Sequence, residues 1–347
     1  MAAEKEKDFV DFIKLASPGT PLRTVINDLL RSNLGATIVF SNKELAEQKI
    51  VEGGFRINCK FSPQRLFELC KMDGAIVISQ DVKKILFANV MLAPDMSIPS
   101  IETGTRHKSA ERTAKQVQTF VITVSERRRK TTLYYGPYRY NLKTTEELTR
   151  NINTTLQILE KQKEVFIENM NTLNILEITG LVTIGDFANV IQRCEIMVRI
   201  SDSIKRDFTE LGHEGNIMYL RFKELVRGIE KAENEILRDY SPSSLKRSKA
   251  FLKEITFNEL LNLESLAKVV FGKDLDEHAE PKGYRFLNNL QMAPEEVNSI
   301  VSYFKNLKEI IDAEAIQIKP LVKSDAEEIT KEIKSLREQI LSRKVIY

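Results

Sequence analysis

The chain has 347 residues, of which 29 % are charged and 42 % hydrophobic, and 52 Lys and Arg against 49 Asp and Glu give a formal net charge of +3. This composition indicates a folded protein of two or three domains and excludes a disordered chain. No apolar run approaches the roughly 18 residues of a membrane span, and the first residues, MAAEKEKDF, lack a signal peptide's apolar core. The three cysteines form no C-x-x-C pair, so we expect a cytoplasmic protein with reduced thiols and no membrane partner.

The first part of the chain alternates between helix and strand patterns. Apolar residues three and four positions apart predict helices at 8–15, 21–34, 63–70 and 109–118, with Thr20, Ser62 and Ser109 as N-caps. Apolar runs rich in β-branched residues predict strands at 36–40, 75–79, 85–92, 120–124 and 131–135. We therefore predict an α/β domain over residues 1–142, with a central mixed sheet flanked by helices.

The apolar spacing in the rest of the chain predicts helices only. One apolar stripe predicts a single long helix, and its members are Leu148, Ile152, Leu156, Leu159, Phe166, Met170 and Leu173. The stripe fits packing inside the chain and an oligomer interface equally well. We predict a helical linker and oligomerisation domain over 143–282 and a small helical C-terminal module over 283–347.

Basic residues concentrate between residues 101 and 145, where ten Lys and Arg face three Glu. Such a concentration favours a phosphate-bearing ligand, although a solvated charged surface also fits. Gly104 and Thr105 precede the basic run Arg106–Lys108, and Ser109 follows it. A glycine, hydroxyl groups and a helix N-terminus together suit an anion, and an ordinary helix start is the alternative.

A second short motif, Asp73-Gly74-Ala75, opens the predicted strand 75–79. Asp-Gly at a strand start is commonly a turn, but it can also place a carboxylate at a sheet edge to hold a divalent cation. The sequence has neither a G-x-x-x-x-G-K-[ST] loop nor a G-x-G-x-x-G fingerprint.

These two motifs, roughly thirty residues apart, resemble the D-G-A and R-H-R motifs of the diadenylate cyclase family. Along the chain, the order of an α/β domain, a long helical segment and a small helical module is similar to that of the DNA-integrity-scanning members of that family. The resemblance implies a nucleotidyltransferase that condenses two ATP into cyclic di-AMP and two pyrophosphates. It also implies two cyclase domains facing each other in a homo-oligomer, an octamer in that family.

The resemblance also implies residue roles. Asp73, Arg106 and His107 would be catalytic, and Asp73 would ligate Mg²⁺ or Mn²⁺. The residues expected to bind ATP are Gly74, Ala75, Leu92, Gly104, Thr105, Arg106, His107, Lys108, Ser109, Ser125 and Glu126. Lys108 stands where the family has arginine, so it keeps the charge but loses the bidentate fork. We expect altered nucleotide affinity rather than lost activity.

The C-terminal module resembles the family's DNA-binding helix-hairpin-helix. Pro320 and Val322 occupy the two glycine positions of the hairpin, and proline has no N–H to offer a phosphate. Residues 286–347 hold nine basic and ten acidic residues, a net charge of −1. DNA thus remains a possible partner, but a weakened one. The alternatives to the enzyme are a nucleotide sensor without turnover and a DNA-binding protein that uses the basic residues of 106–130.

Overall fold

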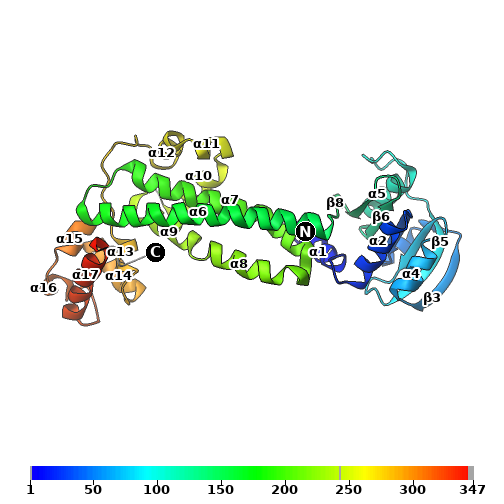
Figure 1. Ribbon diagram of the computed structural model, residues 1–347, viewed down its shortest axis with the longest axis horizontal. Helices are drawn as coiled ribbons and strands as arrows, with labels where there is room; N and C mark the ends of the chain where they lie inside the picture. Colours follow the sequence, from blue (N-terminus) through cyan, green and yellow to red (C-terminus); the bar gives the residue numbers. More distant parts are fainter. Residues whose placement is uncertain (1, 242–243, 343–347) are drawn as a thin grey trace. The chain divides into compact units, whose positions relative to one another are not determined.

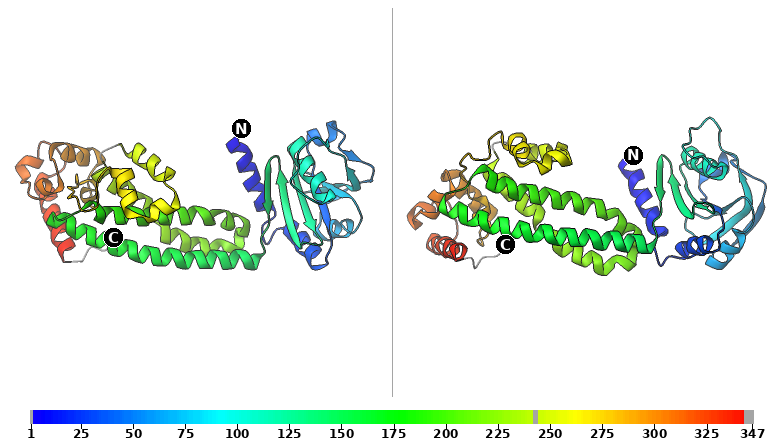
Figure 2. Two further views of the ribbon diagram at one scale, coloured as in Figure 1. Left: turned by 90° about the horizontal axis from the view of Figure 1, so that it is seen from above. Right: turned by 45° about the horizontal axis from the view of Figure 1, so that its top comes forward.

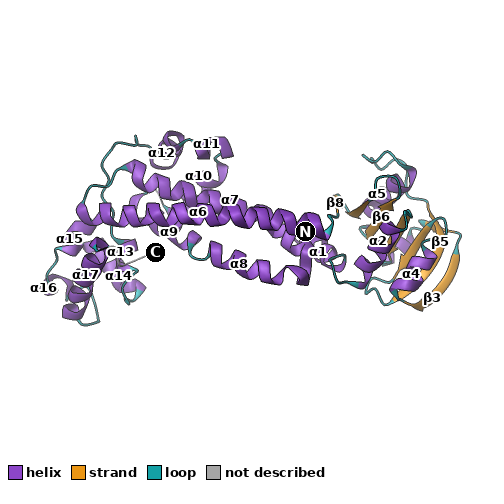
Figure 3. Ribbon diagram, in the orientation of Figure 1, coloured by secondary structure: helices purple, strands orange, loops and turns teal. Residues whose placement is uncertain are grey.

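The computed structural model describes residues 2–241 and 244–342. They divide into two compact units. The sheet unit comprises the residues up to 153 together with 205–219, and the helical unit comprises 154–204 and the residues from 220 onward. The named strands all belong to the sheet unit (Figure 3). None of the described helices is both long and apolar enough to cross a membrane.

The sheet unit contains five helices before the long helix that leaves it. These are α1 (Ala2–Leu15), α2 (Pro21–Arg31), α3 (Lys43–Glu47), α4 (Pro63–Leu69) and α5 (Thr105–Val117). Its strands are β1 (Ala36–Phe40), β2 (Val51–Glu52), β3 (Phe55–Lys60), β4 (Ala75–Ile78), β5 (Lys84–Leu92), β6 (Phe120–Ser125), β7 (Lys130–Tyr135) and β8 (Tyr138–Asn141).

The strands form one eight-stranded mixed sheet in the order β2-β5-β4-β1-β6-β7-β8, with β3 also paired to β5. β1 and β4 are parallel, and the other pairs are antiparallel. Successive side chains of a strand point to opposite faces, so Ile38 packs with α1, α2 and α4, whereas Val39 packs with α3 and α5. The predicted α/β domain with a mixed sheet between helices is therefore confirmed.

Several elements were not predicted. The residues of β3 are mostly exposed, and β2 has only two residues, so neither produces an apolar run. β8 follows β7 after the Gly136-Pro137 turn and is only four residues long, with a half-exposed pattern, so it produces no apolar run either. Helix α5 begins at Thr105 with Gly104 as its N-cap, so the prediction of a start capped by Ser109 was wrong.

The helical unit is all-α, as predicted. Its helices are α6 (Thr145–Thr179, which starts in the sheet unit), α7 (Ile184–Leu211, which ends in the sheet unit), α8 (Asn216–Val226, which starts in the sheet unit), α9 (Ile229–Tyr240), α10 (Leu245–Glu254), α11 (Phe257–Leu261), α12 (Leu263–Phe271), α13 (Tyr284–Leu287), α14 (Pro294–Tyr303), α15 (Leu307–Ile311), α16 (Ala315–Ile318) and α17 (Ala326–Leu341). A 3₁₀ turn, Gly212–Gly215, links α7 to α8. α6 and α7 run side by side through this unit (Figures 1 and 2).

The predicted stripe lies along α6, and all seven of its members are buried inside the chain. This observation resolves the two readings of the stripe, because packing within the chain already covers it. The C-terminal helices form a core of their own, against which Ile175 and Ile178 of α6 pack.

Candidate active site

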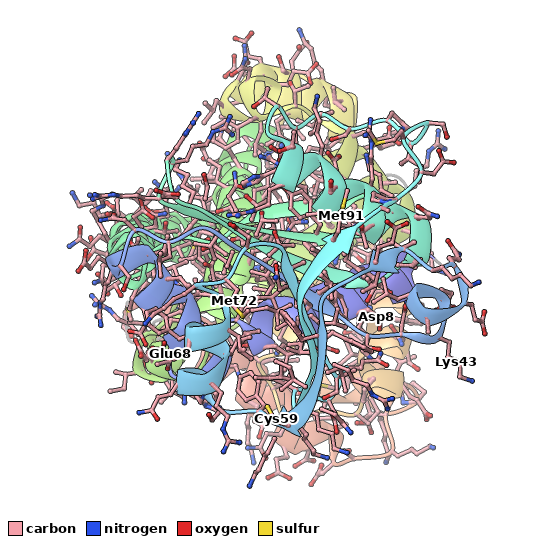
Figure 4. The ribbon with its side chains drawn as sticks, turned by 90° about the vertical axis from the view of Figure 1, so that its right-hand side faces the viewer. Asp8, Lys43, Cys59, Glu68, Met72 and Met91 are labelled. Atoms are coloured by element: carbon pink, nitrogen blue, oxygen red, sulfur yellow. The ribbon has the colours of Figure 1, made fainter. Side chains whose placement is uncertain are left out.

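A cavity of about 220 Å³ opens where β1 and β4 begin and β5 ends. It is lined by Thr37, Gly74, Ala75, Val90, Met91, Leu92, Thr105, Arg106 and Ser109. Six of these were predicted from sequence, and they come from β4, β5 and the first turns of α5. Met91, labelled in Figure 4, is 66 % exposed, so the cavity opens to solvent beside β5.

Gly74 has a backbone conformation that only glycine adopts without strain. Its φ is +86°, and a Cβ there would lie 2.7 Å from the carbonyl oxygen of Val90 and 3.0 Å from the carbonyl carbon of Asn89. The β4–β5 register shifts at this point, and Asn89 has a φ of +54°. A bulge in β5 therefore brings its backbone against Gly74 and shapes the cavity wall.

The first turn of α5, beside this cavity, has no side-chain N-cap hydrogen bond among the described residues. Thr105, Arg106 and His107 occupy its first positions, and the N-cap Gly104 has no side chain that could accept from their N–H groups. Free N–H groups and the positive end of the helix dipole favour an anion. The basic run thus belongs to the helix itself.

Gly35 is a site residue that sequence analysis missed. A Cβ at Gly35 would collide with Nη1 of Arg106, so the guanidinium lies directly against the backbone that leads into β1. No local pattern marks Gly35, because its neighbour is distant in the sequence. A side chain at this position would force the end of the Arg106 side chain to shift.

Glu102, which lies just before α5, is a buried carboxylate with partners on β7 and β8. The carboxylate of Glu102 accepts hydrogen bonds from the Tyr134 hydroxyl (2.9 Å) and from Nε of Arg139 (2.6 Å). Burial lowers the pKa of His107, Glu102 opposes that effect, and the cations of Arg128, Arg106 and Arg139 reinforce it. Together these effects favour the neutral imidazole over the imidazolium. Glu102 was not predicted, because its partners come from two other strands.

The other predicted residues lie outside the cavity lining. Asp73 is exposed and directly precedes Gly74, and it follows Met72, which Figure 4 labels. Gly104, His107 and Lys108 are on or beside α5 but do not line the cavity.

Ser125 and Glu126 also lie outside the lining, at the end of β6. The Ser125 hydroxyl accepts from the N–H of Arg128 (3.2 Å), and Nη2 of Arg128 donates to the Thr103 hydroxyl (3.2 Å). The turn after β6 is thereby tied to the residues that lead into α5.

In the C-terminal module, the turn between α16 and α17 contains Pro320 and Val322, the residues that the resemblance aligns with the two hairpin glycines. One oxygen of Glu296, on α14, accepts from the N–H groups of Lys323 (2.8 Å) and Ser324 (3.0 Å) and from the Ser324 hydroxyl (2.9 Å). A carboxylate of the chain itself therefore holds the turn before α17.

Comparisons with known proteins agree with this architecture. A family model described as DisA bacterial checkpoint controller nucleotide-binding matches residues 23–138, and one described as the DisA linker region matches residues 142–276. The DNA integrity scanning protein DisA of Clostridium botulinum (strain Loch Maree / Type A3) is 38 % identical over 354 residues, covering 99 % of this chain and 100 % of its own length. The chain belongs to the DisA family.

Other DisA proteins are similarly close. That of Clostridium kluyveri is 38 % identical over 350 residues, covering 98 % of this chain and 99 % of its own. That of Clostridioides difficile (strain 630) is 40 % identical over 314 residues, covering 88 % of each. A solved structure of DacA from Staphylococcus aureus, a double mutant, matches with 22 % identity and a TM-score of 0.30, covering 40 % of this chain and 88 % of that one.

The resemblance to diadenylate cyclases seen in the two motifs is thus confirmed at the level of the family. Every residue that lines the cavity falls within the DisA nucleotide-binding match. The sheet unit carries the nucleotide-binding domain of the DisA family.

Proposed function

We propose that the protein is a diadenylate cyclase that condenses two ATP into cyclic di-AMP with release of two pyrophosphates. One observation carries this proposal: the cavity brings Gly74 and Ala75 together with Thr105, Arg106 and Ser109 across a long stretch of sequence. Both motifs of the resemblance contribute to one hollow whose volume, about 220 Å³, suits part of a nucleotide. Membership of the DisA family supports the same reaction class.

The chain's own residues bind and orient the nucleotide. Gly74 lets the nucleotide approach the backbone closely, and Ala75 and Leu92 supply apolar wall beside the base or ribose. The N–H groups of α5, the Thr105 and Ser109 hydroxyls and the Arg106 guanidinium receive the triphosphate. His107, in the first turn of α5, donates a further hydrogen bond to the phosphates. This arrangement works by positioning and charge neutralisation, which are the main requirements of phosphoryl transfer.

The residues present fit a divalent cation that is shared with the substrate. Asp73 is exposed beside the cavity, and its carboxylate has no side-chain partner in the described part of the chain. No cluster of three or more His, Cys, Asp or Glu that could hold a metal occurs among the described residues. One carboxylate, phosphate oxygens and water form a usual set for Mg²⁺ or Mn²⁺. When bound, the cation would neutralise phosphate charge.

The reaction requires two cavities that face each other. The 3′-hydroxyl oxygen of each ATP forms a bond to the α-phosphorus of the other, and the bond from that phosphorus to the pyrophosphate oxygen breaks. The hydroxyl proton passes to a base, a role that we propose for Asp73, and pyrophosphate leaves with the bonding electron pair. We infer a homo-oligomer in which cyclase domains pair, with the octamer of the family as the expected assembly.

The proposal is tested by incubating the full-length protein with ATP and Mg²⁺ or Mn²⁺ and measuring cyclic di-AMP by mass spectrometry. Wild type should form the product, and Asp73→Asn should form none while it keeps its fold by circular dichroism. Asp28→Asn, at a partly exposed aspartate of α2 that does not line the cavity, is the matched control and should retain activity. Robust synthesis by Asp73→Asn overturns the assignment, and ATP binding by wild type without product identifies a sensor.

A further inference from the structure

A second cavity, of about 420 Å³, lies in the sheet unit between α2, the turn joining β6 to β7, and the start of α6. It shares no lining residue with the candidate active site. Its lining contains five basic residues, namely Arg23, Arg129, Lys130, Lys143 and Arg150, and one acidic residue, Glu147.

Two of the basic residues are already neutralised. Nζ of Lys143 lies 2.5 Å from the Asp207 carboxylate. Arg23 is buried; its Nη1 lies 3.6 Å from Glu210, and its Nη2 donates to the carbonyl oxygen of Lys143 (2.5 Å). Nε of Arg23 nevertheless has no hydrogen-bond partner among the described residues, so the lining retains an unsatisfied buried donor.

The other three cations are not neutralised in this way. The side chains of Arg129, Lys130 and Arg150 are exposed and form no hydrogen bond or ion pair with another described side chain. Glu147 is already engaged as a helix cap, because its carboxylate accepts from the N–H of Thr144 (2.9 Å) and its own N–H donates to the Thr144 hydroxyl (3.1 Å). The Glu147 carboxylate also interacts electrostatically with Arg150 and Lys130, so it offsets part of their charge. The three cations, which come from two elements, still leave an excess of positive charge on one concave surface, and such an excess attracts an anion.

We propose that this second cavity is a binding site for a polyphosphate chain, either free or carried by a nucleotide. Two guanidinium groups and one ammonium group, spread over the β6–β7 turn and α6, can engage several phosphate groups in sequence. A chain of two or three phosphates spans such a set better than a single phosphate does. The site stands independently of the proposed cyclase reaction.

The β6–β7 turn gives this site a route to the first cavity. Arg129 and Lys130 line the second cavity, while Arg128 of the same turn reaches the Thr103 hydroxyl, one residue before the N-cap of α5. A polyphosphate held at the second cavity would therefore restrain the segment that positions the start of α5.

The test is a calorimetric titration of the full-length protein with inorganic tripolyphosphate at low salt. Arg150→Gln should weaken binding at this site by about tenfold, the loss of one charge-assisted contact. The matched control is Arg31→Gln, whose side chain is 81 % exposed on α2 and does not line the cavity, and it should bind as wild type does. Because tripolyphosphate can also enter the first cavity, Arg106→Gln should retain the binding event that Arg150→Gln weakens.

Replacing tripolyphosphate with UTP distinguishes the two sources of the ligand. Equal affinity shows that the phosphate chain alone is recognised, and tighter binding of UTP shows that a nucleotide is preferred; either result supports the site. Identical titrations for Arg150→Gln and Arg31→Gln, with both proteins folded by circular dichroism, overturn it.

Discussion

At the scale of single residues, the candidate site depends on positions where backbone geometry rather than side-chain chemistry is decisive. Gly74 and Gly35 both lie where a Cβ would strike a neighbour, in one case the backbone of β5 and in the other the Arg106 guanidinium. Gly74 was predicted because it belongs to a motif. Gly35 was not predicted, because the atom that lies against it, Nη1 of Arg106, belongs to a helix that is distant in the sequence.

Gly74→Ala should destabilise the fold by more than about 1 kcal/mol and weaken ATP binding, because alanine at positive φ is strained and its Cβ meets β5 backbone. Gly53→Ala is the matched control: Gly53 also has a positive φ, of +63°, but a Cβ there has no neighbour within 4 Å. Urea unfolding of both variants separates strain from collision. Equal losses of stability would show that the contact with β5 is unimportant.

At the scale of elements, the sequence predicted which segments form the sheet better than where α5 begins. β1 was predicted at its observed bounds, because a short apolar run of β-branched residues between polar ends has few alternatives. The start of α5 was misplaced because Ser109 resembles a cap, whereas Gly104 caps without a side chain.

Glu102 and Glu111 were not predicted for another reason: their partners are set by tertiary packing. Glu111 accepts from the Ser100 hydroxyl (2.5 Å) and the N–H of Ile101 (3.1 Å), tying the loop before α5 to the helix.

The turn before α17 carries a pH-dependent contribution to stability. Hydrogen bonds from Ser324 and Lys323 lower the pKa of Glu296 from 4.5 to about 2. Because the folded pKa is the lower one, this contribution is present above pH 4.5 and is lost as the pH falls toward about 2. The difference in urea midpoint between wild type and Glu296→Gln should therefore shrink from about pH 6 to pH 3. The exposed neighbour Glu295 provides the control, Glu295→Gln, and an unchanged difference would contradict the role of Glu296.

At the scale of the whole molecule, each unit is completed by residues distant in the sequence. Glu210, from α7, accepts from the Tyr140 hydroxyl (2.7 Å) and from the N–H of Lys143 (2.6 Å), and it faces Arg23 within the sheet unit. Composition and periodicity do not reveal such contacts, because they describe each helix without its neighbours.

The helical unit holds a buried charge network around Arg285. Its guanidinium is hydrogen-bonded to Glu177 and Asn174 of α6, and the N–H groups of Gly283, Tyr284 and Arg285 donate to Asp239 of α9. Arg285→Met leaves two buried carboxylates without a cation, so we expect a loss of about 3–5 kcal/mol in the free energy of unfolding. Arg238→Met, at an exposed position, should cost little. Urea unfolding measures both, and a similar small loss in each would refute the importance of the network.

The same network has a practical corollary for anyone wishing to shorten the protein. A polypeptide that ends at residue 282 would lack only the small C-terminal module. It would nevertheless lose the backbone N–H groups that donate to Asp239 and the Arg285 guanidinium that donates to Glu177. Low stability of such a fragment would result from buried carboxylates that have lost their hydrogen-bond donors. It would not show whether the removed segment takes part in catalysis or binds nucleic acid.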